Sequence, residues 1–223
     1  WMNEEFCRKP NGEKIEPNSR EKYNLYEMTY EEISTFDCGK NGNANFPQQK
    51  AMSVKKPLLS EVFRKIESFT RSNNLKPVVY VIEIKSEIQD DTIFQPAPDE
   101  FVNLVCKVIA EYNVMERCIL QSFDVRILQE LHINYSQTRI AFLVENNESL
   151  QTNLRSLGFV PPIYSPEFIL ANQELMTQLQ QLDIQFVPWT VNEIKDMKQM
   201  IELGATGIIT DYPNHAAELI RQL

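Results

Sequence analysis

The sequence predicts an α/β fold, a TIM (β/α)8 barrel, from the order in which two kinds of segment alternate. From Pro57 to the C-terminus, β-branched runs alternate with segments whose apolar residues recur at helical spacing. Strictly alternating units of this kind form a parallel sheet, either doubly wound or closed as a barrel. No Gly-x-Gly-x-x-Gly turn opens any of the helices, which argues against a dinucleotide-binding sheet and favours the barrel.

Residues 1–56 are expected to stand outside this alternation. They hold clusters of turn-forming residues, little periodic apolar pattern and one short amphipathic stretch over 29–35. The chain therefore divides into a small irregular region, 1–56, and a barrel region, 57–223.

The barrel region begins with a helical pattern at Leu58, Val62, Ile66 and Phe69, and six strand positions follow, each with a helix after it. Pro77 introduces the first strand, and Gly204 is the predicted stop of one helix. The predicted strands cover residues 78–85, 118–123, 140–145, 160–164, 184–190 and 207–211, and the helices after them cover 101–112, 126–131, 150–157, 167–182, 193–203 and 214–223.

The length of the chain indicates that two βα units precede it. A complete eight-unit barrel takes roughly 250 residues, and six units are found in a chain of 223 residues. We therefore expect the first two units upstream of Trp1, so that the chain is part of a longer protein.

Charge and hydropathy exclude two classes of partner. The net charge is −9, from 22 basic and 31 acidic residues, and the scattered bases do not form the footprint of a nucleic-acid binder. The longest apolar run, residues 78–82, is much shorter than the roughly 18 residues of a membrane-spanning helix, so we expect no transmembrane segment. No signal peptide is visible. The compartment, whether cytoplasmic, periplasmic or extracellular, and the oligomeric state are left open.

The four cysteines show no Cys-x-x-Cys pair and no histidine at metal-ligand spacing, which argues against a zinc site. Cys7 and Cys38 bracket one loop-like region, and an oxidising compartment would allow them to pair. The sequence leaves that pairing open.

The first candidate site residues stand at the end of the first strand. In barrels of this kind the active site lies at the C-terminal face. A period of two places Glu83 and Lys85 on the same side, roughly 7 Å apart. A carboxylate that ligates a metal beside a cation suits phosphate chemistry. The alternative is an internal salt bridge, but an uncompensated buried carboxylate costs several kcal/mol, which favours the functional interpretation.

The other strand ends also bring polar and aromatic side chains to this mouth. For Asp124 the favoured interpretation is a helix cap, and for Trp189 and Asp211 a structural and a functional role are about equally supported. His132 is expected to lie on the surface, away from the mouth, and His215 is expected to be structural, so no proton donor is evident. The residues at these strand ends are Ser122, Phe123, Asp124, Glu145, Tyr164, Trp189, Thr190, Thr210 and Asp211.

Five segments, in this order and spacing, resemble the glycerophosphodiester phosphodiesterase family. The resemblance covers Pro57 to Leu223, and residues 1–56 are similar to the small insertion that the family has after its second strand. The segment around Trp189 and the last segment are the specific ones. The five segments are I-E-I-K at 82–85, L-Q-S-F-D at 120–124, Y-S-P at 164–166, P-W-T-V-N at 188–192 and L-G-A-T-G-I-I-T-D-Y-P at 203–213.

This resemblance implies a metal-dependent barrel enzyme that hydrolyses glycerophosphodiesters, its small-molecule substrates, to glycerol 3-phosphate and an alcohol. By analogy Glu83 is the third carboxylate ligand of a divalent cation, Mg²⁺ or Ca²⁺. Lys85 contacts the phosphate as a catalytic and substrate-binding residue, and Trp189 and Phe123 form the apolar wall of the pocket. Ser122, Tyr164 and Asp211 are further residues of the mouth.

The chain also departs from the family pattern. The family's His-Arg-Gly strand, its Glu-x-Asp metal pair and its second histidine belong before Trp1 and are not in this sequence. We therefore expect residues 1–223 alone to fold poorly and to be inactive. Two alternatives remain, namely a related phospholipase C or D-like phosphodiesterase for another headgroup, and a catalytically dead barrel that serves as a binding module.

Overall fold

The computed structural model describes residues 1–222, which form two compact units. One unit consists of Trp1–Pro77 and Ile88–Tyr112. The other, which we call the sheet unit, consists of Val78–Glu87 and the residues from Asn113 onward. All the residues predicted for the active site belong to the sheet unit.

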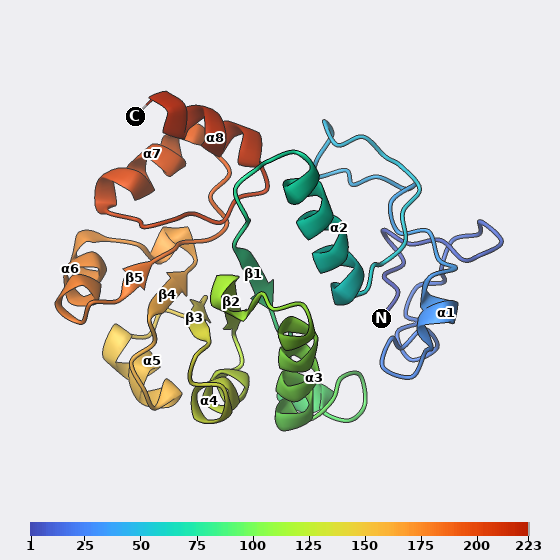
Figure 1. The fold of residues 1–223 in the computed structure, drawn as a ribbon, viewed down its shortest axis with the longest axis horizontal. Coiled ribbons are helices and arrows are strands. Elements are labelled where there is room, and N and C mark those ends of the chain that lie inside the picture. The colour runs from blue at the N-terminus through green and yellow to red at the C-terminus, as the bar shows by residue number, and fades with distance from the viewer. Residues whose placement is uncertain (223) are drawn as a thin grey trace. The chain divides into compact units, whose positions relative to one another are not determined.

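The sheet unit contains five parallel strands in the order of the sequence (Figure 1). A strand order that follows the sequence without reversal is that of a barrel, since a doubly wound sheet reverses at a switch point. The predicted parallel α/β architecture is therefore confirmed. The strands are β1 (Tyr80–Glu83), β2 (Cys118–Ser122), β3 (Arg139–Val144), β4 (Ile163–Pro166) and β5 (Gln185–Phe186).

Helices follow the strands as the alternation predicted, and α4 contacts β2 and β3 while α6 contacts β5. Side-chain caps fix several helix starts: the Asp124 carboxylate accepts from the Arg126 N–H, and Ser149 caps the next helix. Gly204 ends α7 with a φ of 104°, a left-handed conformation that suits glycine. The helices of this unit are α4 (Val125–Asn134), α5 (Leu150–Leu157), α6 (Gln173–Gln181), α7 (Ile194–Leu203) and α8 (Pro213–Gln222), with the short 3-10 turns η2 (Met115–Arg117) and η3 (Phe168–Leu170).

Four predicted elements are wrong in detail. The strand predicted over 184–190 is limited to Gln185–Phe186, and the strand predicted over 160–164 lies at Ile163–Pro166. The helix predicted over 167–182 is divided, because Asn172 has an extended backbone and its side chain caps α6 by accepting from the Leu175 N–H. The predicted strand 207–211 is not a strand, although the Ile209 N–H donates to the Pro188 carbonyl. Pro188 has no N–H to donate, which interrupts pairing along this segment. The end of the helix predicted over 214–223 includes Leu223, which lies outside the described residues.

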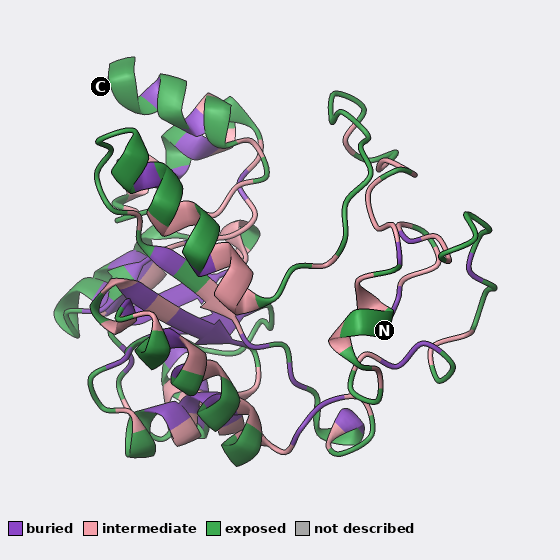
Figure 2. Ribbon diagram, turned by 45° about the vertical axis from the view of Figure 1, so that its right-hand side comes forward, coloured by how far each residue is buried: buried purple, intermediate pink, exposed green. Residues whose placement is uncertain are grey.

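Both faces of the sheet contain buried residues, and the central strands are largely buried (Figure 2). Leu120, Phe142 and Phe186 are buried on the side where the helices pack, and Ala141, Leu143 and Ile163 are buried on the other side. Helix residues complete the core, among them the fully buried Leu128 and Leu179. These apolar contacts therefore fix the positions of the strand ends.

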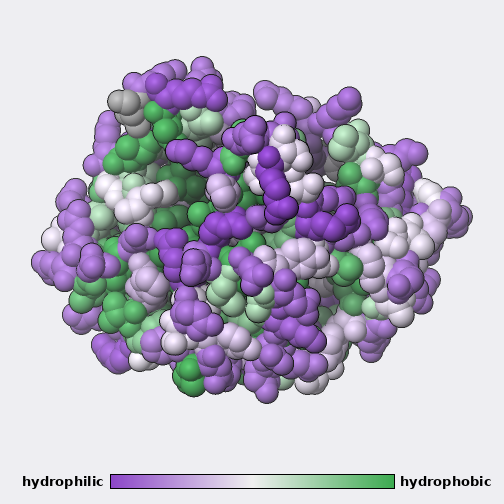
Figure 3. Space-filling view, in the orientation of Figure 1, coloured by the Kyte–Doolittle hydropathy of each residue, from purple (hydrophilic) through white to green (hydrophobic). Residues whose placement is uncertain are grey.

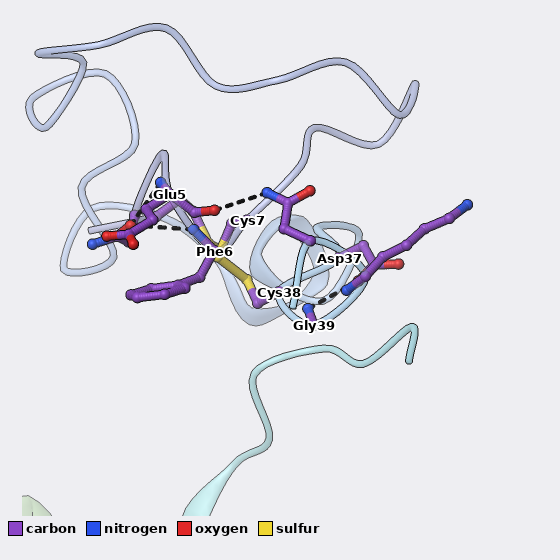
Figure 4. The surroundings of a disulfide bond; sticks show 10 residues. Glu5, Phe6, Cys7, Asp37, Cys38 and Gly39 are labelled. Carbon is purple, nitrogen blue, oxygen red and sulfur yellow. Dashed lines mark hydrogen bonds between the residues drawn. A yellow bond between two sulfur atoms is a disulfide. The ribbon is translucent and has the colours of Figure 1, made fainter. Parts of the chain in front are cut away.

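The first unit combines two longer helices with an irregular, disulfide-linked region. The helices are α2 (Leu59–Ser72) and α3 (Pro98–Glu111), which contact each other, and the short elements are α1 (Tyr30–Ile33) and η1 (Ile88–Asp90). A small apolar cluster, which we call the N-terminal cluster, consists of Met2, Cys7, Ile15, Tyr23 and Phe36. Cys7 is bonded to Cys38 in this region (Figure 4), so the structure forms the pair that the sequence left open.

Candidate functional site

The candidate site lies on the face of the sheet that points away from the helices. Glu83 pairs in register with Gln121, and Gln121 pairs with Ala141, so these residues share one face, opposite to Leu120 and Phe142. The side chains that follow on this face at the strand ends are those of Lys85, Phe123 and Trp189. We call this the open face, because Lys85, Val81 and Phe123 on it are exposed, whereas Gln121 and Ala141 nearer its centre are buried.

Glu83 and Lys85 form an ion pair on the open face, with 2.8 Å between Lys85 Nζ and Glu83 Oε1. The Lys85 side chain is 80% exposed and the Glu83 side chain 25% exposed. The ion pair that the sequence offered as the structural alternative is therefore present, and the Glu83 carboxylate is not uncompensated, because the strand ends at Glu83 and the flexible lysine reaches back to it. An exposed pair of this kind contributes only about 0–1 kcal/mol, so an incoming anion can displace the carboxylate from the lysine at little cost.

Phe123 and Trp189 make an aromatic corner near the same strand ends. Their rings meet edge to face, with 5.3 Å between the centroids. Trp189 is fixed by two hydrogen bonds: its ring Nε1–H donates to the Ser165 carbonyl at 2.8 Å, and its backbone N–H donates to the Pro166 carbonyl at 3.0 Å. Phe123 remains 38% exposed. The two rings together offer an apolar wall.

Exposed apolar side chains continue on the same face of β1. Val79 and Val81 alternate with the buried Tyr80, so they lie on the side of Glu83. The charged pair is thus bordered by apolar surface on its own strand. A second apolar area lies elsewhere on the sheet unit: Figure 3 shows hydrophobic surface where α7 and β5 lie in Figure 1.

Ser122 and Tyr164 stand at strand ends but point to the helix-facing side. Ser122 is buried, and its hydroxyl donates to the Ile84 carbonyl at 2.7 Å. Tyr164 is also buried, its hydroxyl accepts from the Asn153 amide at 2.9 Å, and burial raises the pKa of Tyr164. The structure therefore does not bring these two side chains to Lys85.

Asp211 belongs to a small polar network that joins two chain segments. Its carboxylate accepts from the Asn192 amide at 2.9 Å, and its backbone N–H donates to the Asn192 side-chain oxygen. The Thr210 hydroxyl donates to the same oxygen. Asn192 ends the segment P-W-T-V-N, but its role as the centre of this network follows only from the structure.

The remaining polar candidates have structural partners. Asp124 caps α4, as favoured from the sequence. The exposed His132 stacks on Phe159, and His215 stacks on Tyr212 with 5.2 Å between the ring centroids. Both contacts are ring stacks, which give a histidine a packing role and no proton to transfer.

The described residues do not by themselves fit a divalent cation. Within residues 1–222 no three His, Cys, Asp or Glu side chains come together as a metal site. Glu83 is a single carboxylate and its partner is Lys85, whereas Ca²⁺ takes six to eight oxygen ligands and Mg²⁺ six. No helix among the described residues is long and apolar enough to cross a membrane.

A separate hollow of about 370 Å³ lies where α5 and α6 begin. Asn146, Ser149 and Asn172 are among the residues that line it, and Tyr164 reaches it from the helix-facing side. It is therefore distinct from the open face.

Comparison with known proteins identifies the class to which this fold and site belong. Residues 12–215 match the model of the glycerophosphoryl diester phosphodiesterase family, and the chain belongs to that family. The chain is 29% identical over 198 residues to a glycerophosphodiester phosphodiesterase of Caldanaerobacter subterraneus subsp. tengcongensis, an alignment that covers 88% of this chain and 72% of the relative.

Two further comparisons extend this result. The lysophospholipase D of Rattus norvegicus is 33% identical over 224 residues, covering 90% of this chain and 68% of the relative. A crystal structure from Silicibacter pomeroyi, described as a glycerophosphoryl diester phosphodiesterase, superposes with a TM-score of 0.84 at 24% identity. That superposition covers 99% of this chain and 76% of the other. It confirms the predicted TIM-barrel fold.

Proposed function

We propose that the protein hydrolyses glycerophosphodiesters and releases glycerol 3-phosphate and an alcohol. Family membership supports a phosphodiester substrate. The observation that carries the proposal is the exposed Lys85 beside Glu83 on the open face. Lysine is a point charge suited to phosphate, and the weak pair leaves it free to change partner.

In this proposal Lys85 binds the phosphoryl oxygens in place of the Glu83 carboxylate. The negative charge of these oxygens increases as the attacking water bonds to phosphorus, and the Lys85 cation stabilises that charge more strongly in the transition state than in the ground state. Phe123 and Trp189 exclude water from the apolar side of the substrate.

A divalent cation, Mg²⁺ or Ca²⁺, is the second part of the proposal. It follows from the resemblance to the family, with Glu83 as the carboxylate that this chain contributes. When bound, such an ion acts as a Lewis acid on the phosphoryl oxygens. Exhaustive chelation with EDTA followed by dialysis is therefore expected to abolish hydrolysis, and full activity after this treatment would disprove the metal requirement.

A second candidate is hydrolysis of a lysophospholipid, in which an acyl chain remains on the glycerol. The relative from Rattus norvegicus, a lysophospholipase D, favours this candidate. The exposed aromatic corner and the neighbouring exposed Val81 offer an apolar surface for an acyl chain.

The test compares two substrates with the full-length gene product. Glycerophosphoethanolamine hydrolysis is followed by coupling glycerol 3-phosphate release to its dehydrogenase, and lysophosphatidylcholine hydrolysis is followed by choline release. We expect turnover of the first substrate to exceed that of the second. The reverse order would favour the second candidate, and absence of both activities would favour a barrel that only binds.

A further inference from the structure

Three hydrogen bonds fix the chain around Lys85 beyond the end of β1. The Ile84 N–H donates to the Gln121 carbonyl at 2.9 Å, and the Ile84 carbonyl accepts from the Ser122 hydroxyl at 2.7 Å. The Ser86 hydroxyl donates to the Asp124 carboxylate at 2.8 Å. The residues on both sides of Lys85 are therefore bound to the β2 end.

The acceptor of the Ser86 hydroxyl is itself held in place. Asp124 caps α4 through the Arg126 N–H, and its carboxylate forms an ion pair with the Arg126 side chain at 2.6 Å. The Asp124 side chain is only 9% exposed. The Asp124 N–H also donates to the Ser122 hydroxyl at 3.1 Å, which joins the two contacts into one network.

The Lys85 side chain, in contrast, has no such constraint. It is 80% exposed and contacts Glu83 alone among the ion pairs of the described residues. A long, exposed lysine loses up to about 2 kcal/mol of rotamer entropy when it is fixed. The contacts of Ile84 and Ser86 therefore fix the point from which this side chain extends.

We propose that Ser86 and Asp124 are positioning residues, which hold the backbone of Lys85 so that its ammonium group meets the substrate phosphate. This inference rests on the proposed function. Asp124 thus does more than cap α4, since the same carboxylate connects the starts of two successive loops. Displacement of a reacting group by about 1 Å costs up to about 100-fold in rate.

The test replaces Ser86 by Ala, which removes the hydroxyl, and by Thr, which keeps it. Ser86→Ala is expected to lower kcat about tenfold with KM changed much less, and Ser86→Thr is expected to restore kcat. Ser149→Ala is the matched control, because it removes a serine hydroxyl at the start of another helix, α5, away from the open face. It is expected to leave kcat unchanged within about twofold.

A double-mutant cycle shows whether Ser86 acts through Lys85. In a Lys85→Met background Ser86→Ala is expected to have little further effect, because the group that it positions is already absent. A wild-type kcat in Ser86→Ala, or an undiminished tenfold loss in the Lys85→Met background, would overturn the inference. Asp124→Asn, which keeps a good helix cap, replaces Ser86→Ala if the latter does not fold.

Hydrogen exchange separates this inference from the proposed function. The amide of Ile84 is expected to exchange about tenfold faster in Ser86→Ala than in the wild type, and at the wild-type rate in Ser149→Ala. Unchanged exchange in Ser86→Ala would overturn the positioning role even in an active enzyme. Faster exchange in a protein without phosphodiesterase activity would support the positioning of Lys85 and overturn only the proposed reaction.

Discussion

The two faces of the sheet arise from the same alternation of residues, and both bury apolar residues, but they differ at the strand ends. The helix-facing side buries Leu120, Phe142 and Phe186, whereas the open face ends in the exposed pair of Glu83 and Lys85. Apolar burial fixes the strands, and the exposed end of the open face can then present charged groups to solvent without loss of fold. Stability and chemistry are therefore expected to depend on different faces.

The largest effect is expected from the helix-facing side. Phe186→Ala removes a ring that is 1% exposed, and a change of this kind costs roughly 3–5 kcal/mol of unfolding free energy. Val81→Ala is the matched control on the open face, where the side chain is half exposed, and is expected to cost less than about 1 kcal/mol. Urea unfolding measures both, and equal costs would contradict the difference between the faces.

The second effect concerns a region outside the sheet. The disulfide of Cys7 and Cys38 spans 31 residues, for which chain entropy predicts a stabilisation of about 4 kcal/mol. The N-terminal cluster is small, so we expect Cys7→Ser combined with Cys38→Ser to open residues 1–56 to proteolysis. The sheet unit is expected to keep its protection. Loss of protection in both regions would show that the sheet depends on the disulfide.

On the open face the expected effect is catalytic. Lys85→Met keeps the aliphatic stem and removes the charge, so kcat/KM is expected to fall about 100-fold or more. The exposed pair contributes little stability, and the unfolding free energy is expected to change by less than about 1 kcal/mol. Steady-state kinetics and urea unfolding of the full-length gene product check these values. Unchanged turnover would assign Lys85 a structural role.

The smallest effect is expected at Tyr164, which stands at the end of a strand but does not lie with Lys85 in the candidate site. Tyr164→Phe removes a hydroxyl that accepts from Asn153, which costs about 1 kcal/mol of stability. Because burial raises the pKa of Tyr164 above its ordinary value of 10.0, ionisation favours the unfolded state, and wild-type stability falls as the pH rises above about 10. The Phe variant lacks this contribution. Its kcat/KM is expected to be unchanged, and a strong decrease would place Tyr164 in the site.

Most of the fold could be predicted from local pattern. The parallel α/β architecture, the stop at Gly204 and the cap at Asp124 each depend on residues close in sequence. The errors occur where a contact between distant residues determines the secondary structure. Residues 207–211 are an example, because their pairing is limited by Pro188 in another segment. The predicted helix 167–182 is divided by a local signal, the cap residue Asn172. The helical spacing of apolar residues on both sides of Asn172 led to the prediction of one continuous helix.

The sequence by itself determined the strand faces, because the backbone imposes a period of two, and this period alone places Glu83 and Lys85 on one side of their strand. Which face the helices cover was decided only in three dimensions, and it is the face of Leu120 and Phe142. The same packing turned Ser122 and Tyr164 away from Lys85 and brought Ser86 within hydrogen-bonding distance of Asp124, 38 residues later in the chain. Contacts at that separation leave no local signal, since their formation depends on strand register and helix packing together.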